Sequence, residues 1–309
     1  MKYSIVFPGQ GSQSIGMLSD LSSNFSIVSE IFQEASDALG VDLWKIAQED
    51  QEALNLTENT QPIMLASGYA TYKVLSNEVK LSPVCMAGHS LGEYTALVAS
   101  KSLNFFDAVK LVRRRAELMQ SAVPKGSGSM AAVLGLDDAK VIEICAQSSS
   151  YGVVEAVNFN SPGQVVIAGE KEAVIKACDE MKEAGAKRAL VLPVSVPSHC
   201  SLMTDAAEEF KTSVDTVNFQ LGNVRVIHNV DAEAANDANQ IKSNIVDQLH
   251  KPVLWTSTVL KMKKLGIEKL IEVGPGKVLA GLTRRIDKSL SGSAIIDVAT
   301  LKSTIEELS

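Results

Sequence analysis

The amino-acid sequence predicts an α/β fold, in which a mainly parallel sheet domain carries a small inserted subdomain. Over most of the 309 residues, short apolar segments alternate with amphipathic segments of helical period, which is typical of parallel strands joined by helices. In the middle of the chain the order of elements changes, and stretches rich in glycine or proline precede and follow that region. The chain is long enough for one large domain or two unequal ones.

The first predicted strand covers residues 3–7 and leads into a glycine-rich loop, residues 8–13. The loop lacks the Gly-Lys-Ser/Thr ending of a phosphate-binding P-loop, so that function is not indicated. Because glycines flank Gln10, the backbone there can approach another segment closely. We therefore expect Gln10 to face the serine motif described below.

A helix is predicted to begin near Asn59. Asn59 and Thr60 are residues that cap helices, Pro62 is suited to a first turn, and apolar residues continue to Leu75. This helix separates the first predicted strand from the second.

A serine framed by glycines, in Gly88-His89-Ser90-Leu91-Gly92, follows the apolar run 83–87 and precedes a helix-like stretch, 93–99. The pattern G-x-S-x-G between a strand and a helix is typical of a nucleophile elbow, in a hydrolase-like sheet domain. Ser90 would present its hydroxyl at the helix N-terminus, where backbone N–H groups favour an oxyanion. The alternative is an ordinary turn in which Ser90 caps the helix.

A helix predicted over residues 105–122 carries an arginine on its apolar face. At 100° per residue, its apolar residues occupy one broad arc and its other charged residues lie opposite, but Arg115 falls inside the arc. A guanidinium stays charged, so it must reach solvent or meet a buried anion. Two interpretations remain open: a structural pair with a buried carboxylate or carbonyl, and a bidentate fork for a substrate carboxylate.

The middle of the chain predicts a ferredoxin-like βαββαβ subdomain. The strands are predicted at 130–135, 153–157, 164–169 and 187–192, and the helices at 137–148 and 171–184. The stretches 126–129 and 193–197 are the expected hinges. We therefore assign residues 125–196 to the small subdomain, and residues 1–124 and 197–309 to the large catalytic domain.

A serine nucleophile needs a base, and histidine is the usual one. Of the four histidines, His89 adjoins Ser90 but its side chain should diverge at such a turn, whereas His199 lies where the chain returns from the insert, over the expected cleft. A capping or core role for His199 is the alternative. Three aspartates could complete a triad, and the sequence excludes none of them: Asp205, Asp231 and Asp247.

Composition restricts the classes of function. The net charge of −7 argues against nucleic acid as a partner. Four widely separated cysteines, with no C-x-x-C pair, support neither a zinc site nor a disulfide framework, and His89 with Glu93 offers two metal ligands but no third. We expect neither a signal peptide nor a membrane span, and we expect a reducing, cytoplasmic location.

Five motifs of the chain resemble those of the malonyl-CoA:acyl-carrier-protein transacylases of fatty-acid synthesis, and they occur in the family's order over nearly the whole chain. The motifs are Phe7 to Gln13, Gly88 to Glu93, Asn160 to Gln164, Pro197 to His199 and Glu272 to Gly276.

The resemblance implies a role for each matching residue. His199 lies in the Pro-Ser-His segment that supplies the family's base, and the backbone carbonyl of Gln248 would hold its imidazole in place of an aspartate. Arg115, just before the Met119-Gln120 pair, would bind the free carboxylate of malonate. The basic pair Lys187-Arg188 would meet phosphates of coenzyme A.

The predicted reaction is therefore a ping-pong acyl transfer, from malonyl-CoA to Ser90 and then to the phosphopantetheine thiol of acyl-carrier protein. His199 acts as the base, and the backbone N–H groups of Gln10 and Leu91 hold the oxyanion. No metal or redox cofactor is expected, and we expect a monomer.

An acidic carrier protein would be repelled by the net charge, so its docking requires a local basic patch. The candidates are Lys110-Arg113-Arg114, Lys187-Arg188, Lys261-Lys263-Lys264 and Arg284-Arg285, although each is also interpretable as a solvated helix face.

Two other functions are alternatives. G-x-S-x-G also serves esterases and lipases, but the Gly-Gln-Gly loop, the arginine in the apolar arc and the ferredoxin-like insert disfavour a hydrolase. A non-catalytic module that docks a carrier protein is disfavoured because Ser90 and His199 are both present.

Overall fold

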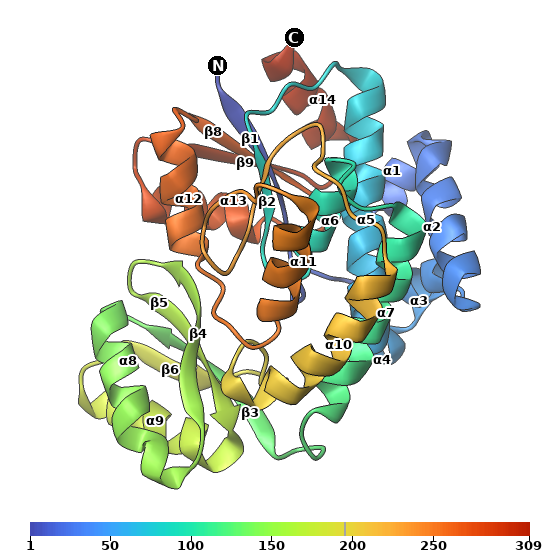
Figure 1. Ribbon diagram of the computed structural model, residues 1–309. Helices are drawn as coiled ribbons and strands as arrows, with labels where there is room; N and C mark the ends of the chain where they lie inside the picture. The colour runs from blue at the N-terminus through green and yellow to red at the C-terminus, as the bar shows by residue number, and fades with distance from the viewer. Residues whose placement is uncertain (195) are drawn as a thin grey trace.

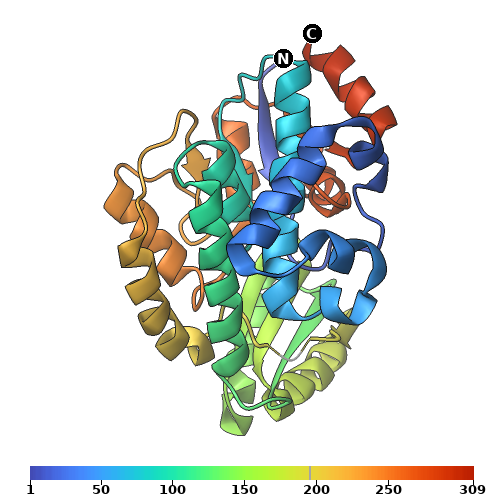
Figure 2. The same cartoon turned by 90° about the vertical axis from the view of Figure 1, so that its right-hand side faces the viewer.

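The computed structural model describes residues 1–194 and 196–309, and places them in two lobes of unequal size (Figure 1). Both views place the two chain termini at one end of the molecule and the smaller lobe at the other (Figures 1 and 2). No helix among the described residues is both long and apolar enough to span a membrane.

The larger lobe contains a five-stranded sheet of order β7-β2-β1-β8-β9, in which every neighbouring pair is parallel. The strands are β1 (Tyr3–Phe7), β2 (Met86–Gly88), β7 (Val226–Ile227), β8 (Lys269–Val273) and β9 (Ser291–Ile295). All residues of the central strands β1 and β8 are buried, as expected where helices cover both faces of a parallel sheet. The sheet therefore sits in the middle of the lobe, and its strand ends are where a site can form.

Helices surround this sheet. They are α1 (Ser19–Asn24), α2 (Ser26–Leu39), α3 (Leu43–Glu49), α4 (Gln51–Leu54), α5 (Thr57–Glu78), α6 (Gly92–Ala99), α7 (Phe105–Ser121), α10 (Thr204–Thr216), α11 (Ala238–Asp247), α12 (Trp255–Lys264), α13 (Val278–Ile286) and α14 (Val298–Leu308), with a short 3-10 helix, η2 (Ser201–Met203).

The smaller lobe contains an antiparallel sheet of order β4-β5-β3-β6. Its elements are β3 (Gly128–Leu134), α8 (Asp138–Gln147), η1 (Ser148–Tyr151), β4 (Val154–Ser161), β5 (Gln164–Glu170), α9 (Lys171–Glu183) and β6 (Arg188–Val191). The predicted fold class, a mainly parallel α/β sheet domain with an inserted βαββαβ unit, is confirmed.

All these elements lie inside the range 125–196 that we assigned to the small subdomain, whose boundaries stay a prediction. The second expected hinge, 193–197, includes residue 195, which lies outside the described residues.

Two predicted elements begin at different residues in the structure. The second strand begins at Met86 rather than near Pro83, and proline has no N–H to donate to a sheet. The helix expected from Asn59 begins at Thr57, so Pro62 lies inside it and cannot donate to the carbonyl of Glu58, four residues earlier. Arg113 Nη1 donates to that carbonyl instead, at 3.2 Å.

The two lobes are joined by backbone hydrogen bonds as well as by the connecting chain. The N–H of Phe159 in β4 donates to the carbonyl of Val253 at 3.0 Å, and the N–H of Val253 donates to the carbonyl of Val157 at 2.8 Å. Arg285 of α13 also donates to the side chain of Gln164 in β5, at 3.2 Å. The small lobe is therefore fixed against the segment that leads into α12.

Candidate active site

Ser90 lies on a sharp turn between β2 and α6, with a φ of 51°. Residues other than glycine rarely adopt this left-handed backbone conformation, and those that do are often found at functional sites. A Cβ at Gly88 would lie 1.9 Å from the carbonyl carbon of Gly92, and a Cβ at Gly92 would lie 2.1 Å from the carbonyl oxygen of Phe7. Only glycine fits at either position, so the turn has the crowded geometry of a nucleophile elbow.

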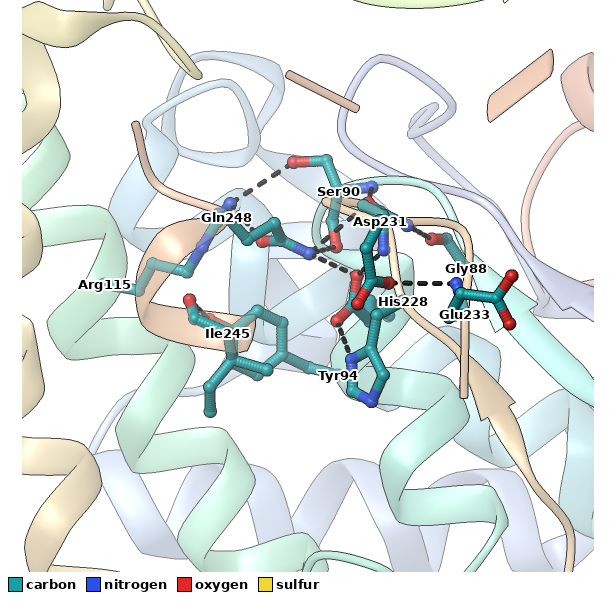
Figure 3. Close-up of polar contacts among 11 residues, drawn as sticks. Gly88, Ser90, Tyr94, Arg115, His228, Asp231, Glu233, Ile245 and Gln248 are labelled. Carbon is teal, nitrogen blue, oxygen red and sulfur yellow. Dashed lines mark hydrogen bonds and ion pairs between the residues drawn. The ribbon is translucent and has the colours of Figure 1, made fainter. Parts of the chain in front are cut away.

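Two amide side chains hold this turn, those of Asn229 and Gln248, and Figure 3 labels Gln248 beside Ser90. The Asn229 side chain accepts from the Ser90 N–H at 2.7 Å and donates to the Gly88 carbonyl at 2.7 Å. Gln248 Nε2 donates to the Ser90 carbonyl at 3.0 Å. These bonds satisfy the backbone polar groups around a strained residue, and they stabilise the turn that carries the Ser90 hydroxyl.

His199 lies beside Ser90, and the distance between Ser90 Oγ and His199 Nε2 is 2.8 Å. Its other ring nitrogen, Nδ1, lies 2.6 Å from the backbone carbonyl oxygen of Gln248. A carbonyl only accepts, so Nδ1 carries the proton and Nε2 is left to accept from the serine hydroxyl. The imidazole is therefore oriented to act as a general base.

Asp205, Asp231 and Asp247 are the three candidate aspartates for a triad. None of them forms a hydrogen bond with His199. Asp247 pairs with Lys251 at 2.9 Å, Asp231 accepts from the Glu233 N–H, and the Asp205 side chain is exposed. The third position of the triad is thus occupied by a main-chain carbonyl.

The environment of His199 keeps its imidazole neutral. The pKa of His199 is lowered from 6.5 to about 3, first by burial and then by the positive charge of Arg115, while the hydrogen bond to the Gln248 carbonyl opposes the shift. Below pH 6.5 the unfolded chain takes up a proton at this histidine that the folded protein does not. This residue therefore makes the folded state less stable as the pH falls from 6.5 towards 3.

The same shift predicts the pH profile of the first half-reaction. The kcat/KM for acylation of Ser90 reports ionisations of the free enzyme, and the free imidazole is a base at every pH above about 3. We expect no inflection near pH 6.5, the ordinary pKa of histidine. Rapid-quench intact-mass measurements from about pH 8 to about pH 5 test this. A rate that falls tenfold per pH unit below 6.5 would contradict it.

The N–H groups of Leu91 and Gln10 were the predicted oxyanion donors. Neither donates a hydrogen bond to any residue that the structure describes. The loop that carries Gln10 lies against the elbow, because a Cβ at Gly9 would be 2.4 Å from the His89 carbonyl oxygen. The Gln10 side chain itself is exposed and lies 3.5 Å from the hydroxyl of Thr57.

Arg115 is 1 % exposed, on the buried face of α7. Its Nη1 donates to Gln61 Oε1 at 2.9 Å, and its Nη2 donates to Gln248 Oε1 at 2.9 Å and to Ser90 Oγ at 3.3 Å. Among the described residues, the buried Nε of Arg115 has no hydrogen-bond partner, and the guanidinium forms no ion pair. A buried cation beside the nucleophile thus has two neutral amide oxygens as acceptors and no carboxylate in contact.

The remaining histidines have other partners. His89 Nε2 lies 2.8 Å from Asn160 Oδ1 of the small lobe, so its side chain points away from Ser90. His228 pairs with the buried carboxylate of Glu93, and His250 lies near Asp247. Among the described residues, no three side chains of histidine, cysteine, aspartate or glutamate are grouped to hold a metal ion. The four cysteines are free and buried.

Lys187 and Arg188 lie at the start of β6, at the edge of the small sheet, and both are exposed. No described hydrogen bond or ion pair joins them to the elbow. Lys187 packs against Gly135, whose N–H donates to the carbonyl of Gly163. Gln164, which follows Gly163, accepts from Arg285, so a series of contacts links Lys187 in the small lobe to Arg285 in the large one.

Three residues of the site had no predicted role in catalysis: Gln61, Asn229 and Glu93. From the sequence, Glu93 is a candidate only as a metal ligand. A charged residue in the apolar stretch 93–99 is a signal of a buried contact, as the arginine on α7 was. Gln61 and Asn229 lie in segments where nothing in the sequence distinguishes them.

The fold and the serine–histidine pair define a serine enzyme that carries an acyl group. In agreement, the acyl transferase domain family matches residues 4–303. The chain belongs to this family, and within it to the malonyl CoA-acyl carrier protein transacylases. Relatives of that name from Haemophilus influenzae and Escherichia coli K12 are 51% and 49% identical over 309 and 306 residues, which is 99% of each chain.

Solved structures agree with these relatives. The crystal structure of an acyl carrier protein S-malonyltransferase from Vibrio cholerae has a TM-score of 0.96 and 51% identity, covering 98% of this chain and 100% of that one. A malonyl-transacylase in complex with a type II PKS acyl-carrier protein has a TM-score of 0.98 and 47% identity, covering 99% of this chain and 100% of that one.

Proposed function

We propose that the protein transfers a malonyl group from malonyl-CoA to the phosphopantetheine thiol of an acyl carrier protein, through a malonyl ester of Ser90, in fatty-acid biosynthesis. Family membership supports the reaction. The single observation that supports the acyl group is Arg115, a buried cation beside the nucleophile without a contacting carboxylate. A substrate carboxylate supplies a counter-charge in direct contact.

The first half-reaction begins with His199. Its Nε2 accepts the proton of Ser90, and Oγ attacks the thioester carbonyl carbon. The N–H groups of Leu91 and Gln10 donate to the oxyanion, and each such donor contributes roughly 3 kcal/mol. When the tetrahedral intermediate collapses, the C–S bond breaks, and His199 returns the proton to the sulfur of coenzyme A.

The second half-reaction runs through the same steps in reverse. The carrier thiol gives its proton to His199, its sulfur attacks the malonyl ester, and Ser90 leaves with that proton. Since the base is held by a carbonyl, its imidazolium form lacks a carboxylate partner. A malonate carboxylate on Arg115 offsets the positive charge that lowers the pKa of His199, and so brings this base closer to the working pH.

We propose that Lys187 and Arg188 bind phosphate groups of coenzyme A. Within the candidate basic patches, several cations already have acidic partners: Arg113 and Arg114 with Glu117, Arg114 with Glu209, Lys261 with Glu233, and Lys263 with Asp287. The other cations of these patches form no ion pair with any residue that the structure describes: Lys110, Lys187, Arg188, Lys264, Arg284 and Arg285. The pair Lys187-Arg188 is therefore available to an external anion.

Reversing both charges, in Lys187→Glu/Arg188→Glu, is expected to raise the KM for malonyl-CoA with little change in kcat. The rise should be larger at low salt, where exposed charges are less screened. Steady-state kinetics at two ionic strengths measure it. Lys80→Glu/Lys302→Glu, the same charge change at two other exposed positions, is the control. An unchanged KM would show that Lys187 and Arg188 are only solvated surface residues and do not bind coenzyme A.

The reaction itself is tested by intact mass spectrometry after brief exposure to malonyl-, acetyl- and methylmalonyl-CoA, followed by addition of holo acyl carrier protein. We expect a malonyl adduct that persists in buffer and moves to the carrier. An adduct lost to water at the same rate without the carrier would favour the hydrolase. No adduct at all would favour a carrier-docking module.

We further propose that the protein acts as a monomer in the cytoplasm without a metal or redox cofactor. The elbow, the base and Arg115 come from one chain, so no second copy is needed to complete the site. The four free, buried thiols fit a reducing compartment. Each step of the mechanism is a proton or acyl transfer that these side chains perform.

A further inference from the structure

Glu93 is fully buried in α6, three residues after the nucleophile, and its carboxylate contacts three groups. Oε1 lies 2.7 Å from His228 Nδ1. Oε2 accepts from the Asn229 N–H at 2.9 Å and from Gln248 Nε2 at 2.9 Å. The proposed mechanism assigns no role to this buried carboxylate.

The contact with Gln248 fixes which way its side-chain amide points. A carboxamide can rotate to exchange its oxygen and nitrogen, and here its two ends face opposite kinds of partner. Arg115 only donates, so it requires the oxygen, and ionised Glu93 only accepts, so it requires the NH₂ group. The reversed amide would lose both bonds, and also the bond from Nε2 to the Ser90 carbonyl, and it would bring like groups together. Glu93 is the charged acceptor of this set.

We propose that Glu93 is a positioning residue that orients the Gln248 side chain, and through it holds the Arg115 guanidinium where a substrate carboxylate binds. This inference rests on the proposed role of Arg115. His199 depends on the backbone carbonyl of Gln248, which an amide rotation leaves in place. Glu93 therefore acts on the preference for carboxylated acyl groups more than on the base.

The test compares Glu93→Met with Glu93→Gln, by the ratio of kcat/KM for malonyl-CoA to that for acetyl-CoA. Methionine has a similar length but cannot accept, so Gln248 Nε2 keeps the Ser90 carbonyl and the Asn229 side chain but loses its charged acceptor, and the ratio should fall about tenfold or more. Glutamine keeps an oxygen for Gln248 and can donate to the other tautomer of His228, so it should retain most of the ratio. Equal losses of the ratio in the two variants would overturn the inference.

The Arg115→Ala background shows whether Glu93 acts through the arginine. There, adding Glu93→Met should leave the ratio unchanged, because the group being positioned is absent. If Arg115→Ala alone leaves the ratio unchanged, the proposed function of Arg115 fails. If Arg115→Ala lowers the ratio but Glu93→Met does not, only the present inference fails.

Two further variants separate positioning from folding. Glu272→Met, at another fully buried glutamate, is the matched control and should affect both acyl groups alike. Gln248→Met removes the amide but keeps the backbone carbonyl, so it should reproduce the fall in the ratio even if Glu93→Met fails to fold. A ratio unchanged by Gln248→Met would overturn the inference.

Discussion

The Ser90→Ala variant is expected to gain no malonyl mass on exposure to malonyl-CoA, because the hydroxyl at the elbow is the atom that forms the ester. The His199→Ala variant should still be labelled, but about 10²- to 10⁴-fold more slowly, since it lacks the general base. Rapid-quench intact-mass spectrometry measures both rates.

The control for this pair is His250→Ala. His250 lies near Asp247, and its removal leaves Ser90 and His199 in place, so labelling should proceed at the full rate. Peptide mapping of the native adduct locates the ester. Full-rate labelling of Ser90→Ala would show that another residue is the nucleophile, and full-rate labelling of His199→Ala would remove the base from the mechanism.

The Arg115→Ala variant is expected to lose malonyl transfer selectively. Without its cation, the carboxylate of malonate would face the amide oxygens of Gln61 and Gln248 that Arg115 contacts, at a cost of about 3 kcal/mol, or roughly a hundredfold in kcat/KM. Acetyl transfer needs no cation and should hold or rise. Arg115→Lys should restore only part of the loss, because an ammonium cannot reproduce the planar fork.

A structural role for Arg115 gives a different result. If the arginine only links Gln61 to Gln248, the alanine variant will lose thermal stability, and the kcat/KM values for malonyl and acetyl transfer will fall by the same factor. Arg113→Ala is the matched control on the same helix. It removes the bonds to Glu117 and to the α5 carbonyl, and should lower the melting temperature without changing the acyl preference.

The order of elements was predictable because periodicity is a local property of the sequence. The six elements of the insert follow from alternating and helical patterns, although β4 runs to Ser161, beyond the predicted end at 157. That strand pairs with β5 through two irregular positions, and period-two alternation does not continue across a shift of register.

The site was predictable where one residue violates its local pattern or stands in a constrained turn. Ser90 is framed by glycines, and Arg115 interrupts an apolar arc. Gln248 could be assigned only through the family resemblance, and Asn229 was not assigned at all. Both bind the elbow across more than 130 residues of chain, and a contact between distant segments leaves no periodic signal.

The small lobe is inserted into the sequence of the large lobe, between the nucleophile and its base. This order determines when a newly made chain becomes active. The nucleophile is synthesised 109 residues before the base that it contacts and 158 residues before Gln248. The central strand β1 pairs with β8, which is synthesised near the end of the chain. A nascent chain that still lacks these late segments therefore has the nucleophile without its base, and cannot consume thioesters before most of its synthesis is complete.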